Sequence, residues 1–116
     1  MDKLFQRINA DRAMSANERA FGSTESENQA IELTFDLGVY AGDLVGIYVS
    51  SEEGEDSFPF VFEIFGSNDD EEYFKIGEIK IPTSEGVYKT YWNTFKYIKL
   101  NTESKGNHTI EVMGGR

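Results

Sequence analysis

Apolar and polar residues alternate along most of the chain after residue 30. In the stretch 30–37 every second residue is large and apolar, namely Ile31, Leu33, Phe35 and Leu37. The same period of two recurs at Val45, Ile47 and Val49, and again at Phe58, Phe60, Phe62 and Ile64. Because the side chains of a strand point alternately to its two faces, this pattern predicts half-buried strands.

The stretch from Phe58 to Ile81 predicts a pair of strands around a turn. Its centre, residues 66–69, reads Gly-Ser-Asn-Asp. Gly and Asn tolerate positive φ, and Ser and Asp side chains can bond to nearby backbone, so this is turn chemistry. Apolar residues then resume at Phe74, Ile76, Ile79 and Ile81. We expect a hairpin or a longer-looped pair of strands, with these apolar residues in the core.

Three further β-prone stretches lie at residues 87–92, 95–100 and 108–113. Their best core candidates are Ile98, Leu100, Ile110 and Val112. About seven or eight short strands at this spacing are typical of a sandwich or a barrel. We therefore expect an all-β fold, a jelly-roll-like antiparallel β-sandwich, and no helix after residue 20.

Residues 1–29 differ in composition from the rest, so we predict an N-terminal arm (1–29) before a β-sandwich domain (30–116). The arm is polar and rich in small residues, and it is expected to be extended or partly helical. It is either a partly ordered tail or an arm that reaches a neighbouring subunit. In the second case its apolar anchors and basic partners are Leu4, Phe5, Ile8, Arg7, Arg12 and Arg19.

The charge is acidic and unevenly spread. The net charge is −10, and residues 20–74 hold fourteen Asp or Glu and no Lys or Arg. Such a surface repels a phosphate backbone, so nucleic acid is not an expected partner. A membrane is not one either, since no apolar run approaches the ~18–20 residues of a spanning helix, and the first residues do not read as a signal peptide. The chain has no Cys, which excludes disulfides and thiol chemistry.

Candidate catalytic chemistry is sparse. His108 is the single histidine, which makes a zinc site or a Ser–His–Asp triad improbable, and we expect it at the surface or at a strand edge. The carboxylates of residues 52–56 and 69–72 can supply calcium ligands but read more simply as solvated loops. The sequence predicts a protein that is not an enzyme and that needs no metal or cofactor.

An aromatic cluster near the end of the chain has two interpretations. Tyr88, Tyr91 and Trp92 lie within five residues. They can form an exposed platform on which a sugar stacks, or they can fill a core or a subunit contact. The second interpretation is the commoner fate of rings at this spacing.

Five stretches together resemble the small jelly-roll cement, or decoration, proteins of tailed bacteriophage capsids. They are AIELTFDLG (30–38), AGDLVGIYV (41–49), FVFEIFGSNDD (60–70), FKYIKLN (95–101) and TIEVM (109–113). The likeness covers roughly residues 30–113 and lies in order and pattern. The motif F-x-I-x-G-S-N-D (62–69) is also similar to the discoidin-type, galactose-binding-like sandwiches.

The first resemblance implies a non-enzymatic virion protein made in the host cytoplasm. It would sit on the outer capsid surface, bridge major capsid proteins and assemble as a homotrimer. The acidity and the long charged start depart from the cement pattern. The second resemblance implies the alternative, a carbohydrate-binding β-sandwich module.

Overall fold

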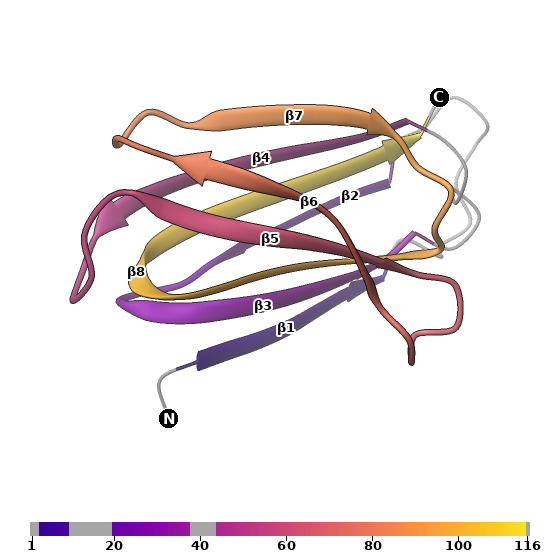
Figure 1. The fold of residues 1–116 in the computed structure, drawn as a ribbon, viewed down its shortest axis with the longest axis horizontal. Coiled ribbons are helices and arrows are strands. Elements are labelled where there is room, and N and C mark those ends of the chain that lie inside the picture. Colours follow the sequence, from indigo (N-terminus) through magenta and orange to yellow (C-terminus); the bar gives the residue numbers. More distant parts are fainter. Residues whose placement is uncertain (1–2, 10–19, 38–43, 116) are drawn as a thin grey trace.

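The computed structural model describes residues 3–9, 20–37 and 44–115, and these residues form eight strands without a helix (Figure 1). This confirms the all-β prediction. The strands are β1 (Lys3–Asn9), β2 (Ala20–Glu25), β3 (Gln29–Asp36), β4 (Leu44–Glu53), β5 (Phe60–Ser67), β6 (Phe74–Ile81), β7 (Val87–Trp92) and β8 (Tyr97–Gly115). The described residues contain no helix long and apolar enough to cross a membrane.

The strands form two packed layers that share β8. In the layer that we call sheet I, the order is β1-β3-β8-β5-β6, with the first part of β8 between β3 and β5. In sheet II the order is β2-β8-β4-β7, with the second part of β8 between β2 and β4. In Figure 1 β8 runs to one end of the sandwich in one layer, bends, and returns in the other. All pairs are antiparallel except β1–β3, which is parallel.

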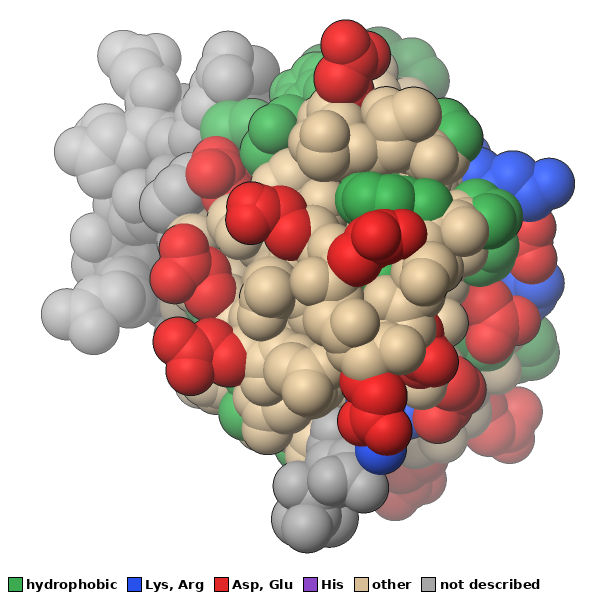
Figure 2. Space-filling model, turned by 90° about the vertical axis from the view of Figure 1, so that its left-hand side faces the viewer, with side chains coloured by type: hydrophobic (Ala, Val, Ile, Leu, Met, Phe, Trp, Pro, Cys, Tyr) green, Lys and Arg blue, Asp and Glu red, His purple; other side chains and the backbone are tan. Residues whose placement is uncertain are grey.

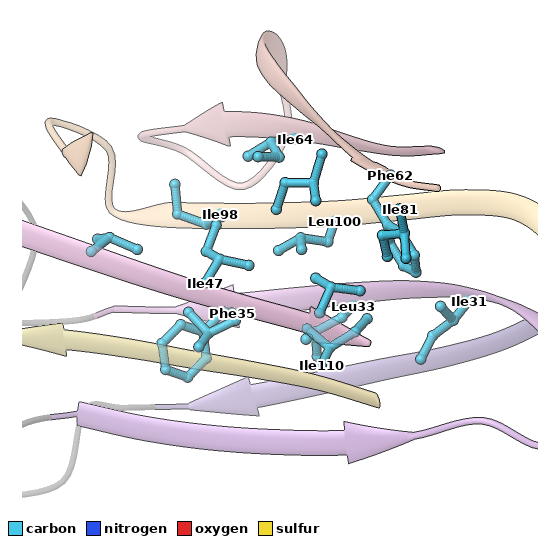
Figure 3. Close-up of a cluster of buried hydrophobic side chains, with 14 of the residues drawn as sticks. Ile31, Leu33, Phe35, Ile47, Phe62, Ile64, Ile81, Ile98, Leu100 and Ile110 are labelled. Carbon is cyan, nitrogen blue, oxygen red and sulfur yellow. The ribbon is translucent and has the colours of Figure 1, made fainter. Parts of the chain in front are cut away.

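The core fills the space between the two layers (Figure 3). The inward positions that the alternation predicted on β3, β4, β5 and β8 are buried, as Phe35, Ile47, Phe62 and Leu100 illustrate. Burying such side chains is worth about 1.5–3 kcal/mol each, which makes this core the main source of stability. The inward and outward faces of the sheets are thereby fixed.

The prediction for β6 was half wrong. Ile79 and Ile81 are buried, but Phe74 is 57% exposed and Ile76 is also exposed. The reason is a shift in the register of β5 and β6 after Ile64: Ile76 is the extra residue of β6 at this irregularity, and Phe74 lies beyond it, opposite Gly66 at the end of the pair.

The N-terminal segment is extended where it is described, so the partly helical expectation is wrong there. β1 pairs with β3, and β2 pairs with the second part of β8. Leu4 and Ile8 pack against the core from β1, which supplies the apolar contacts that hold the strand in place. The boundary at residue 30 stays a prediction, although strands on both sides of it share the sandwich.

Candidate functional site

The outer face of sheet II carries exposed aromatic rings. Trp92 and Tyr88 lie on the edge strand β7 and are 79% and 54% exposed. Tyr88 is in register with Tyr48 of β4, whose outward direction follows from the buried neighbours Ile47 and Val49. We call Tyr48, Tyr88 and Trp92 the ring strip.

Two glycines let the tyrosine rings lie flat on the sheet. A Cβ at Gly46 would collide with the hydroxyl end of Tyr88, and a Cβ at Gly86 would collide with that of Tyr48. The close neighbour of each glycine is thus a tyrosine side chain and not backbone. Each ring therefore covers the neighbouring strand, which fixes its orientation.

The ring strip leads into a polar groove of about 670 Å³ on the same face. Ser50, Thr109 and Glu25 form one row across β4, β8 and β2. Tyr48 lines the groove and joins it to the ring strip. The remaining lining residues, Ser26, Glu27, Ser51, Glu52, Ser84 and Asn107, come from strand ends and turns. We call this the polar groove.

The carboxylates of this region have no cationic partner in the part of the chain that the structure describes. Glu25, Glu27 and Glu52 line the polar groove, and Glu111 is in register with Tyr48. None of the four forms an ion pair with a Lys or Arg among residues 3–9, 20–37 and 44–115. Figure 2 shows the end of the sandwich at which β8 bends, where acidic side chains are scattered and basic ones show only at the margin.

The outer face of sheet I is organised differently, because its charges are paired. Lys3 binds Glu103 at 2.6 Å and Asn101 at 2.5 Å. Lys99 lies 3.8 Å from Glu32 and stacks over the Tyr73 ring at 3.9 Å. The small hollow on this face is therefore lined by charged groups that are already paired with one another.

A second paired cluster lies at the turn between β5 and β6. Arg7 pairs with Asp70 at 3.0 Å, and Tyr73 donates its hydroxyl to the same carboxylate. The Tyr73 hydrogen bond, helped by Arg7, lowers the pKa of Asp70. Burial, together with the bond to Asp70, raises the pKa of Tyr73. These shifts reflect a closed network and need no ligand.

The acidic turn that follows β5 is held together by hydrogen bonds to its own Asp69 carboxylate. The Asp69 carboxylate accepts the backbone N–H groups of Glu71 and Glu72 at 2.9 Å and the Ser67 hydroxyl at 3.0 Å. The two backbone bonds lower the pKa of Asp69. Across the described residues, no group of three or more His, Cys, Asp or Glu side chains is arranged to hold a metal ion.

The predicted interaction residues of the N-terminal segment are not free anchors in this structure. Leu4 and Ile8 contact the protein's own core, and Arg7 is engaged by Asp36 and Asp70. Phe5 is 57% exposed, with Lys3 over its ring. Arg12 and Arg19 lie outside the described residues. A role for this segment in binding a partner stays a prediction.

His108 is buried, which corrects the expectation of a surface position. Its Nε2 donates to the Ser104 carbonyl at 2.9 Å, and its Nδ1 lies 2.7 Å from the Ser51 hydroxyl. The edges of Phe60 and Phe62 enclose the ring. Burial lowers the pKa of His108, since the site favours the neutral imidazole. Its two nitrogens are both used, so His108 is a structural residue of the bend in β8.

Two aromatic residues of β7 are not in the core, which was one of the two positions that the commoner interpretation gave them. Trp92 and Tyr88 are on the surface and not in the core of this chain. The side chain of Tyr91 lies outside what the structure describes. The platform interpretation is the one that fits a single copy of the chain, while a contact with another subunit stays a prediction.

No protein-family model and no curated protein matches the chain. Among solved structures, a Yersinia pseudotuberculosis-derived mitogen has a TM-score of 0.50 at 10% identity, over 85% of this chain and 86% of the mitogen. The Clostridium perfringens domain CpGH89CBM32-6 has a TM-score of 0.48 at 20% identity, over 83% of this chain and 77% of that one.

A further similar structure is truncated AlyQ with its CBM32 and alginate lyase domains, at a TM-score of 0.47 and 18% identity. It covers 88% of this chain, but the chain spans only 28% of that protein. At these identities the likeness concerns the β-sandwich fold alone. Two of these three structures carry CBM32 in their names.

Proposed function

We propose that this protein is a non-catalytic carbohydrate-binding β-sandwich module. The observation that carries the proposal is the ring strip, which is exposed on one face and continues into the polar groove. The flat face of a sugar ring is apolar and stacks on aromatic rings, while its hydroxyls need hydrogen-bond partners. The ring strip supplies the aromatic surface, and Ser50, Thr109 and the carboxylates supply the hydrogen-bond partners.

The arrangement also fits what a binding site requires. Concave sites combine apolar surface with a few polar groups that fix orientation. Trp92 and Tyr88 are exposed together on one face, and a contiguous exposed apolar patch favours a binding role. The capsid, trimer and virion predictions rest on the sequence resemblance alone and stay predictions.

Trp92 makes the proposal testable, because it is the single tryptophan and its fluorescence reports the site alone. Soluble oligosaccharides are added while a neutral quencher is titrated. A glycan that stacks on the ring strip is expected to shield Trp92 from the quencher.

Calorimetry on variants then locates the site. Trp92→Ala is expected to weaken the affinity about tenfold or more, as loss of a central aromatic anchor does. Phe74→Ala is the matched control, because Phe74 is similarly exposed but lies on sheet I. Shielding that occurs without sugar and disappears on dilution would identify the ring strip as a subunit contact and overturn the proposal.

A further inference from the structure

The outer faces of sheet I and sheet II differ in whether their charged groups have a partner of opposite charge. On sheet I, the ammonium groups of Lys3 and Lys99 are held by Glu103 and Glu32. In the polar groove on sheet II, Glu25, Glu27 and Glu52 face solvent without a Lys or Arg partner in the described parts of the chain. The groove therefore presents negative charge that no described residue neutralises.

Two lysines on strands of sheet II, Lys89 and Lys105, bind groups outside the groove. Lys89 is on β7, beside the ring strip, but its ammonium group donates to the Glu78 carbonyl at 3.4 Å. Lys105, at the bend of β8, lies 3.5 Å from Glu55. Like charges that share a groove repel one another, and a cationic ligand would relieve that repulsion whereas an anionic ligand would add to it.

We propose that the ligand is a glycan chain that carries free amino groups. This inference rests on the proposed function and names the class of sugar for the same site. The ring strip stacks on the sugar rings, and Glu25, Glu27 and Glu52 receive the ammonium groups of the units in the polar groove. A carboxylate that accepts a charged donor makes a stronger hydrogen bond than one that accepts a hydroxyl.

The spacing of the rings indicates a chain and not a single sugar. Trp92 and Tyr88 are four residues apart on one strand, which places their backbones about 13 Å apart. Tyr48 is in register with Tyr88, and the polar groove extends beyond it along β4. One sugar ring cannot contact Trp92 and the groove together, so several linked units are needed to use both.

The test compares three oligosaccharides of equal length by calorimetry: a β-1,4-linked glucosamine oligomer, its N-acetylated form, and an oligogalacturonate. The pH is chosen so that the amines are protonated and the carboxylates are ionised. At low salt the amino form is expected to bind about tenfold more tightly than the acetylated form, since each partly exposed ion pair contributes about 1.5- to 5-fold. The uronate is expected not to bind. At about 1 M salt the difference between the first two should nearly vanish.

Substitutions separate charge from stacking. Glu25→Gln and Glu52→Gln are each expected to weaken the amino form about two- to fivefold and to leave the acetylated form unchanged. Glu71→Gln is the matched control, because Glu71 is an exposed carboxylate at the turn after β5. Trp92→Ala is expected to weaken both glycans.

The outcomes distinguish this inference from the function on which it rests. Equal affinity for the amino and acetylated forms would overturn the amino preference and leave carbohydrate binding in place. Failure of these and other glycans to shield Trp92 would overturn both. Oligolysine that binds as tightly as the amino glycan, with no loss in Trp92→Ala, would show a surface for any polycation and overturn the inference.

Discussion

The two outer faces of the sandwich have the same kinds of residue but use them in opposite ways. On sheet I, carboxylates such as Asp70 and Glu103 are paired with Arg7 and Lys3 from β1. On sheet II, carboxylates lie beside exposed rings and lack such partners among the described residues. Where polar groups already form hydrogen bonds or ion pairs within the protein, a ligand adds little binding free energy. On sheet II, a ligand can supply the partners that the carboxylates lack. The comparison therefore teaches where to look for binding.

The largest effect is expected from the core that holds both faces in place. Phe62 is fully buried between the layers. Phe62→Ala should lower the free energy of unfolding by about 3–5 kcal/mol, measured by chemical denaturation. Phe74→Ala, at an exposed position, should change it by less than about 1 kcal/mol. An equal loss in the two variants would mean that the assignment of inward and outward faces is wrong.

Removal of β1 is expected to affect sheet I and to leave the ring strip on sheet II unchanged. Deleting residues 1–9 takes away Lys3 and Arg7, and with them three ion pairs of sheet I, with Glu103, Asp36 and Asp70. It also uncovers the surface under Leu4 and Ile8, so we expect a loss of about 2–4 kcal/mol in unfolding free energy. Glycan affinity at the ring strip should be unchanged. A truncated chain of full stability would restore the idea of a loosely attached arm.

Low pH is expected to lower the stability of the whole sandwich through His108, which lies at the bend of β8. Because the folded protein lowers the pKa of this residue, the unfolded chain takes up a proton more readily. Stability is therefore complete above the unfolded pKa of about 6.5 and falls as the pH drops below it, by at most about 1.4 kcal/mol per pH unit. Thermal unfolding between neutral pH and the titration range of carboxylates measures this loss. His108→Gln should remove the slope, and a slope that persists would assign it to other groups.

The smallest effect is expected from a single basic residue of sheet I. Arg7→Ala should cost about 0.5–1 kcal/mol, because its pairs with Asp70 and Asp36 are partly exposed. Glycan affinity should not change. Glu25→Gln is the counterpart on sheet II and should leave stability unchanged, since Glu25 has no cationic partner in the described chain. A stability loss in Glu25→Gln would indicate a partner for this carboxylate and weaken the contrast between the faces.

The alternation of apolar residues predicted the core because a strand has only two faces. Ile47, Phe35 and Phe62 follow directly from that rule. Phe74 and Ile76 were misplaced because the register of β6 shifts against β5 after Ile64, an irregularity that the apolar pattern does not reveal. Residues 3–9 were hard to predict since a parallel edge strand needs a partner distant in sequence, which local composition does not reveal.

The site was predicted only in part. Exposure of Trp92 and Tyr88 was one of two interpretations, and aromatic content alone does not decide between core and surface. The polar groove joins residues from β2, β4 and β8, and it exists only once these strands are aligned. The burial of His108 was missed because its partners, Ser51 and Ser104, come together only at the bend.

The sharing of β8 between the layers has a consequence for how the protein is made. β8 is the last strand in the described chain, and it pairs with β2, β3, β4 and β5. When residues 1–96 have left the ribosome, the apolar faces of β2, β3, β4 and β5 are exposed. Their common partner, β8, has not yet emerged. Native pairing with β8 must then wait until residues 97–115 have emerged, because contacts this distant in sequence form late and slowly. During that interval the emerging chain depends on its acidic turns, or on chaperones, to stay unaggregated.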